Sequence, residues 1–174
     1  TAKRLNPVEM DTIIQEINHS KVLILCGQMT QDFKVQHELI KLASFPNIVV
    51  LVENTSNLQH ERFIHCIDRT LNGFDQKNVA FQPEILITIG GAVVSKRIKA
   101  YLRSAGVKKH YKIGAEFPEM DTYRCLSQAI ALNPSDFFEQ INEHELTANT
   151  HNFNGKWKGI DVVAKDRSLD YVSE

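Results

Sequence analysis

This sequence has no apolar run long enough to cross a membrane and no recognisable signal peptide. Cysteine is scarce: Cys26, Cys66 and Cys125 show no CxxC spacing, which favours reduced thiols in a cytoplasmic protein. His60 and His65 are five residues apart, and no cysteine or carboxylate completes a zinc site around them. We therefore expect a cytoplasmic protein with no membrane span, and no metal ligands in this chain.

The glycine-rich fingerprint of a dinucleotide site is also missing. The turn after the first predicted strand reads CGQMTQ, with Gly27 as its sole glycine, although Glu53 stands where a ribose-binding acid would fall. No GxSxG motif occurs, and Ser95 is better explained as a helix N-cap than as a nucleophile. We expect neither cofactor-binding nor catalytic residues in this chain.

Excess charge of either sign is absent, because the formal net charge is -1 at pH 7. A general nucleic-acid binder needs a summed positive field, so that class of protein is excluded. The content of 43% hydrophobic and 24% charged residues is ordinary for a globular protein, and 174 residues suffice for one domain with a sizeable core.

Hydrophobic periodicity predicts strands that alternate with helices. Strands are expected at 21–26, 47–52, 85–89, 109–113 and 124–132, the first three as continuous apolar runs buried on both faces. Helices are expected at 7–19, 32–45, 61–71, 95–105 and from 133 onward. The third of these would place Phe63, Ile64, Ile67 and Leu71 on one core-facing side. This alternation predicts an α/β fold with an open, doubly wound, mostly parallel sheet, Rossmann-like but without the dinucleotide fingerprint.

We expect a single α/β domain over residues 1–146, with its core over 21–141. The stretch HNFNGKW at 151–157 reads as part of a linker, and 158–172 reads as a helix that leads to a further domain. In doubly wound folds, function resides at the carboxyl ends of the strands. That edge would include residues 27–30, 53–57 and 90–97.

Two adjacent cations, Lys96 and Arg97, open the predicted helix that follows Gly90 and Gly91. A helix N-terminus already carries partial positive charge, so each cation there costs about 0.3 to 1 kcal/mol unless an anion lies nearby. No acidic residue occurs from 85 to 115, so we expect a bound anion, with Gly90, Gly91 and Ser95 supporting the site. The alternative for the remaining cations is a solvated basic face: Lys99, Arg103, Lys108, Lys109 and Lys112.

The order VLILCGQMT, VVLVENTSNL, PEILITIGGAVVSKRIKAYL and NPSDFFEQI resembles the middle domain of a thiamine-diphosphate enzyme family of menaquinone biosynthesis. The family is that of the 2-succinyl-5-enolpyruvyl-6-hydroxy-3-cyclohexene-1-carboxylate synthases, or SEPHCHC synthases. The resemblance covers roughly residues 21–141, and its most specific part is the GGxxxSKR stretch from Gly90 to Arg97.

The resemblance implies a three-domain enzyme that joins a decarboxylated 2-oxoglutarate unit to isochorismate. Thiamine diphosphate and Mg²⁺ would be bound by the N- and C-terminal domains, and the full-length enzyme is expected to be a homo-oligomer. It further implies that Lys96 and Arg97 reach the substrate from the middle domain, whereas this piece alone is inactive. It assigns no role to Gln28 or to residues 54–57.

Two other hypotheses remain open from the residues. One is a freestanding Rossmann-like module that binds an anionic metabolite or nucleotide. The other is a structural domain whose exposed edge only mediates assembly.

Overall fold

Five strands form one parallel sheet in a computed structural model that describes residues 3–114, 118–147 and 151–172. Their order across the sheet is β2-β1-β3-β4-β5, and every neighbouring pair is parallel. The bounds are β1 (Val22–Cys26), β2 (Ile48–Val52), β3 (Ile85–Ile89), β4 (Lys109–Ile113) and β5 (Leu126–Ile130). The strand order reverses between β1 and β3, so the ends of these two strands form the topological switch point.

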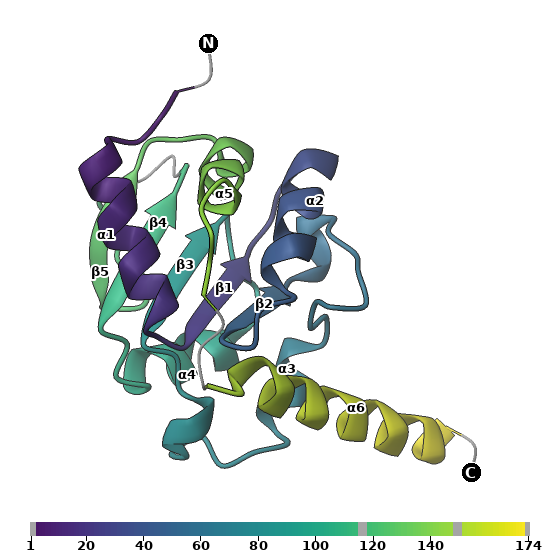
Figure 1. Ribbon diagram of the computed structural model, residues 1–174. Helices are drawn as coiled ribbons and strands as arrows, with labels where there is room; N and C mark the ends of the chain where they lie inside the picture. The colour runs from purple at the N-terminus through teal and green to yellow at the C-terminus, as the bar shows by residue number, and fades with distance from the viewer. Residues whose placement is uncertain (1–2, 115–117, 148–150, 173–174) are drawn as a thin grey trace.

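Helices cover both faces of the sheet (Figure 1). One face carries α1 (Pro7–Asn18), α2 (Phe33–Leu42) and α5 (Pro134–Asn142), and the other carries α3 (Ile67–Leu71), α4 (Lys96–Ser104) and α6 (Phe153–Val172). Short 3₁₀ helices, η1 (Asn54–Ser56) and η2 (Val79–Phe81), lie in the loops. The predicted doubly wound α/β fold is confirmed.

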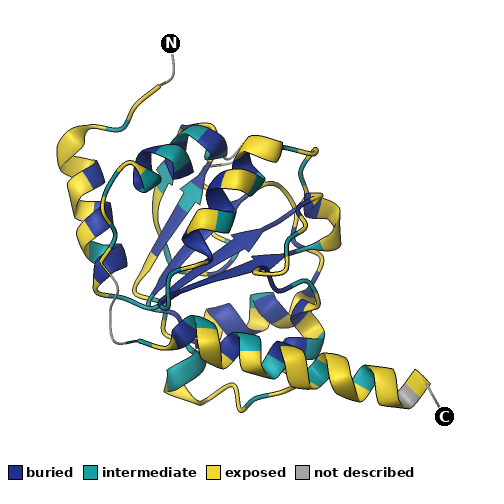
Figure 2. Ribbon diagram, turned by 45° about the vertical axis from the view of Figure 1, so that its right-hand side comes forward, coloured by how far each residue is buried: buried dark blue, intermediate teal, exposed yellow. Residues whose placement is uncertain are grey.

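The continuous apolar runs fill two cores, because successive side chains of a strand point to opposite faces. All five residues of β1, β2 and β3 are buried. Ile24 belongs to the core under α1, α2 and α5, whereas its neighbours Leu23 and Leu25 belong to the core under α3, α4 and α6. Burial on both faces, as predicted for these runs, is confirmed (Figure 2).

The predicted helix at 61–71 is wrong in its first half, because α3 begins only at Ile67. Residues before it run beside the edge strand β2: the Ile64 amide donates to the Val50 carbonyl at 2.9 Å, and the Ile64 carbonyl accepts from Val52 at 3.0 Å. This extended segment satisfies backbone groups that an edge strand otherwise leaves unpaired. Phe63 and Ile64 consequently face different cores instead of sharing one helical face. All four apolar residues are nevertheless buried, as predicted.

The predicted linker at 151–157 is also wrong from Phe153 onward, and the earlier part at 148–150 lies outside the described residues. Phe153 and Trp157 occupy the first turns of α6, four residues apart on one helical face, and both are buried in the second core. The Asn154 amide donates to the Pro46 carbonyl at 2.8 Å, which fixes the helix start beside β2.

The far part of α6 extends away from the sheet and is mostly exposed (Figures 1 and 2). Its exposed apolar residues are Val162, Val163, Leu169 and Val172. Among the described residues, no helix combines the length and apolar character that a membrane crossing requires.

Candidate functional site

The carboxyl edge of the sheet brings together the three predicted segments, which follow β1, β2 and β3. The Gly27 amide donates to the Ile89 carbonyl at 3.0 Å, and the Glu53 amide donates to the Cys26 carbonyl at 3.0 Å. The ends of the three strands are thus joined by backbone hydrogen bonds. Residues 27–28, 53 and 90–97 form one continuous edge.

Glycines at the switch point let two loops cross closely. The Gln28 amide donates to the Ala92 carbonyl at 3.0 Å, and the Gly91 amide donates to the Gln28 carbonyl at 2.7 Å. A Cβ on Gly27 would lie 2.3 Å from the Gly91 carbonyl oxygen, and Gly90 has a φ of +76°, which other residues rarely adopt. Sequence reasoning placed Gly27, Gly90 and Gly91 on the same edge but did not predict the contact between them. The loops after β1 and β3 are therefore in direct backbone contact at the switch point, where other doubly wound folds hold a phosphate.

Ser95 is the N-cap of α4, as predicted, and its side-chain oxygen accepts from the Ile98 amide at 3.1 Å. Two carboxylates from distant parts of the chain also bind it. Its amide donates to Oε1 of Glu53 at 3.0 Å, and its hydroxyl donates to Oδ1 of Asp68. These acids supply negative charge at the helix start, which the sequence from 85 to 115 lacks. Glu53 and Asp68 therefore partly compensate the positive charge at the start of α4, which weakens the electrostatic argument for a bound anion.

Lys96 and Arg97 are both exposed in the first turn of α4. The Arg97 guanidinium donates to the side-chain carbonyl of Asn72, the residue that ends α3. No hydrogen bond or ion pair joins the Lys96 ammonium to the part of the chain that the structure describes. Neither cation is paired with a carboxylate there.

Several other cations of the same stretch do have acceptors elsewhere in the fold. Lys108 forms an ion pair with Glu84 at 3.1 Å, and Lys109 forms one with Glu16 at 3.2 Å. Nε of Arg103 donates to the Thr122 carbonyl at 2.8 Å. A simple solvated basic face does not describe these three residues. Lys108 and Lys109 are thus neutralised by carboxylates, whereas Lys96, Arg97 and Arg103 have no carboxylate partner among the described residues.

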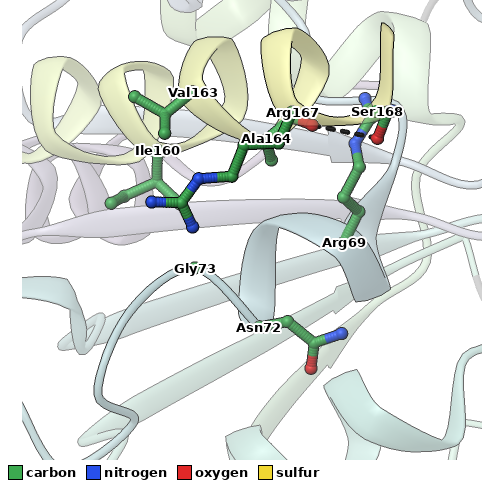
Figure 3. A pocket seen from close by; sticks show the side chains of 8 residues that line it. All are labelled: Arg69, Asn72, Gly73, Ile160, Val163, Ala164, Arg167 and Ser168. Carbon is green, nitrogen blue, oxygen red and sulfur yellow. Dashed lines mark hydrogen bonds between the residues drawn. The ribbon is translucent and has the colours of Figure 1, made fainter. Parts of the chain in front are cut away.

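A cavity of about 470 Å³ opens between α3 and α6, beside Asn72 (Figure 3). Arg69 reaches from α3 toward Ser168, and Arg167 reaches from α6 past Ile160 toward Gly73. The fully buried carboxylate of Asp161 lies 4.0 Å from the Arg69 guanidinium and 2.9 Å from the Lys165 ammonium. Asn72 lines this cavity and also accepts the hydrogen bond from Arg97, so it connects the first turn of α4 to the cavity.

A second cavity, of about 520 Å³, lies beyond the ends of β1 and β2 and is lined largely by amide side chains. Its lining residues are Gln31, Phe33, Gln36, Asn54, Asn57, Leu58, Gln59 and His65. Asn57 adopts a left-handed conformation and donates to the Met29 carbonyl at 2.7 Å. The loop at 54–57, to which the sequence assigned no role, is thereby fastened to the loop after β1.

The described residues of this edge include no metal-ligand cluster of the kind that a thiamine-diphosphate site uses. Such a site needs oxygen ligands for the divalent metal that bridges the diphosphate. Within residues 3–114, 118–147 and 151–172, no group of three or more His, Cys, Asp or Glu side chains is placed to hold a metal ion. The loops after β1 and β3 also contact each other directly at the switch point.

Comparison with known protein families assigns the chain. A family model described as the middle domain of thiamine pyrophosphate enzymes matches residues 1–158. The chain belongs to this family. The match includes Phe153 and Trp157, whose side chains pack into the core of this middle domain.

Curated relatives of the middle domain are named 2-succinyl-5-enolpyruvyl-6-hydroxy-3-cyclohexene-1-carboxylate synthase. The protein from Flavobacterium johnsoniae is 40% identical over 134 residues, which are 75% of this chain and 24% of the relative. That from Flavobacterium psychrophilum is 39% identical over 138 residues, or 78% of this chain and 25% of the relative. The protein from Desulfotalea psychrophila is 28% identical over 151 residues, which are 86% of this chain and 28% of the relative. The middle domain thus spans about a quarter of the length of these relatives.

Proposed function

We propose that this chain is the middle domain of a SEPHCHC synthase. The full-length enzyme would add the succinyl-semialdehyde unit of decarboxylated 2-oxoglutarate to isochorismate in menaquinone biosynthesis. Supporting this proposal, curated relatives with that name are up to 40% identical to the chain and align with most of it. We further propose that the enzyme is cytoplasmic and homo-oligomeric.

Thiamine diphosphate and Mg²⁺ would be held by the N- and C-terminal domains; in support, the described residues of this chain include no group of three or more His, Cys, Asp or Glu side chains placed to hold a metal ion. The cofactor would supply the decarboxylation of 2-oxoglutarate, so the isolated middle domain would be inactive. We also propose that residues 1–146 form the domain and that residues 147–174 connect it to the third domain. The first turns of α6 lie in this connecting segment and pack on the domain that precedes them.

Lys96 and Arg97 would anchor the carboxylates of isochorismate. The observation that carries this role is that both cations are exposed at the functional edge and lack a carboxylate partner among the described residues. Arg97 rests on a neutral amide oxygen, and a carboxylate would replace that contact with a stronger, charge-assisted and bidentate one. The Lys96 ammonium would add a second donor one residue away.

The test is steady-state turnover of the full-length enzyme with thiamine diphosphate, Mg²⁺, 2-oxoglutarate and isochorismate. Arg97→Ala should lower kcat/KM for isochorismate by an amount that corresponds to a loss of about 2 to 4 kcal/mol in transition-state stabilisation. Decarboxylation of 2-oxoglutarate should stay largely intact. Arg103→Ala is the matched control, since it removes the same side chain from the far end of α4. If the enzyme is active and the two variants have equal kcat/KM for isochorismate, Arg97 does not bind the substrate and the domain has only a structural role.

The second candidate is a freestanding module for an anionic metabolite or nucleotide, favoured by the cavity between Arg69 and Arg167. Calorimetric titration of this chain with NAD, FAD and coenzyme A distinguishes the two functions. Tight binding of any of them would favour the module, and inactivity of the full-length enzyme would do so as well.

A further inference from the structure

The contact between Glu53 and Ser95 connects the ends of two strands that are not neighbours. Glu53 follows β2 and Ser95 follows β3, and β1 lies between them in the sheet. The Glu53 backbone is held to the end of β1 through its amide, while its carboxylate accepts from the Ser95 amide at 3.0 Å. The side chain of Glu53 therefore bridges the functional edge from the outer strand to the start of α4.

Asp68 holds the same residue from another direction. It lies in the first turn of α3, which packs beside α4, and accepts a hydrogen bond from the Ser95 hydroxyl. Ser95 itself is buried, and its hydroxyl oxygen also accepts from the Ile98 amide. The amide and the hydroxyl of Ser95 thus form hydrogen bonds with three different segments of the chain.

We propose that Glu53 and Asp68 are positioning residues that fix the first turn of α4 and so direct Lys96 and Arg97 toward the substrate. This inference rests on the proposed anchor role of the two cations. Because Ser95 immediately precedes Lys96, a shift of its backbone would move both cations together. A displacement of about 1 Å at a reacting centre can cost on the order of a hundredfold in rate.

The carboxylates also keep the cations available. Within the described residues, the carboxylates of Glu53 and Asp68 accept hydrogen bonds from Ser95 and not from Lys96 or Arg97. Their negative charge lowers the cost of two cations at a helix N-terminus, yet it does not occupy the donors of those cations. A direct ion pair with Arg97 would lower that cost as well but would compete with a substrate carboxylate.

Kinetics of the full-length enzyme test the proposal. We expect Glu53→Ala and Asp68→Ala to lower kcat/KM for isochorismate about ten- to a hundredfold, mainly through KM, with 2-oxoglutarate decarboxylation changed less than about twofold. Glu53→Gln and Asp68→Asn retain an acceptor oxygen and should stay within about threefold of wild type. Asn133→Ala is the control, because it removes the N-cap of α5 on the opposite face of the sheet.

A merely structural role would lower both partial reactions equally, or would make Asn133→Ala behave like Glu53→Ala, and either result overturns the proposal. A second test uses enzyme that already lacks both Lys96 and Arg97 side chains. Adding Glu53→Ala there should change kcat/KM less than about twofold, because residues acting through one another are not additive. A full additional loss would show that Glu53 acts by another route.

Amide hydrogen exchange of the 174-residue chain separates this proposal from the proposed function. Glu53→Ala and Asp68→Ala should accelerate exchange at Ile98 at least about tenfold relative to Asn133→Ala. Unchanged exchange, or faster exchange with unchanged isochorismate kinetics, overturns the positioning role. Failure of the anchor role is seen independently, in the kinetics of Arg97→Ala.

Discussion

Nε2 of His110 lies 2.7 Å from Oγ1 of Thr88, in a contact that links β4 to β3. The His110 side chain is only 1% exposed, and its ring packs edge-on against Tyr123. Nδ1 is buried and has no hydrogen-bond partner within the described part of the chain. Burial lowers the pKa of His110 from 6.5 to about 4; Lys112 also lowers the pKa, and Asp121 opposes the shift.

Stability should therefore decline in mild acid. A buried neutral histidine contributes fully above its unfolded pKa, and the contribution is lost as pH falls from about 6.5 toward 4. The loss should be on the order of 3 kcal/mol, measured as the urea unfolding free energy between pH 7 and pH 4. His110→Gln should reduce this decline, whereas the same change at exposed His19 should leave it intact. If the unfolding free energy of His110→Gln declines as much as that of the wild type, other titratable groups cause the decline.

Trp157 should be essential for the stability of this chain. It is fully buried, lies 5.0 Å from the ring of Phe74, and donates from its indole nitrogen to the Phe81 carbonyl at 3.1 Å. Trp157→Ala should cost about 3 to 5 kcal/mol in chemical denaturation. Leu169→Ala in the exposed part of the same helix should change stability by less than about 0.5 kcal/mol. Equal effects would mean that the first turns of α6 are not docked in solution.

Alanine substitutions at Gly90 and Gly106 distinguish two causes of lost stability: steric contact between the crossing loops and strain from a positive φ. Both have positive φ, but a Cβ on Gly90 would lie 2.9 Å from the carbonyl oxygens of Gly27 and Gln28, whereas one on Gly106 meets nothing within 4 Å. Gly106→Ala should cost about 1 to 2 kcal/mol from strain alone. Gly90→Ala should cost about 1 to 3 kcal/mol more, because the loops must move apart. Thermal unfolding of both variants tests the difference.

The three cysteines should react with iodoacetamide in a fixed order. Cys66 is exposed, Cys125 is half-buried and Cys26 is fully buried. Burial raises the pKa of Cys125 to about 11, and it raises the pKa of Cys26 still further, so thiolate is scarce at both. Mass spectrometry should find Cys66 modified first and Cys26 only after unfolding. Early modification of Cys26 would show that β1 opens readily.

The sequence predicts well those features that depend on neighbouring residues. The runs at β1, β2 and β3 are apolar at almost every position, which indicates burial on both faces wherever they lie. The caps Asn6, Ser95 and Asn133 hydrogen-bond within their own first turns, so their function can be inferred from a few residues. The prediction of an anion site at Lys96 and Arg97 rests on the same kind of local chemistry and stays a prediction.

Contacts between distant segments could not be inferred in this way. Glu53 lies 42 residues before Ser95, and nothing near either residue indicates the other. Pairing of Ile64 with the edge of β2 overrides a helical pattern that is locally sound. The docking of α6 has a weak local signal, since Phe153 and Trp157 share a helical face, but Gly155 between them lowers helix propensity.

The crossing of Gly27 and Gly91 has a mechanical consequence. Loops that bind ligands often close by moving their backbone, but here movement of the loops after β1 and β3 past each other would break the hydrogen bonds between them. We therefore expect the first turn of α4 to move little, so that Lys96 and Arg97 would adjust their reach through their long side chains. If Lys96 and Arg97 anchor a substrate, that substrate would then have to be brought to the cations by other parts of the enzyme.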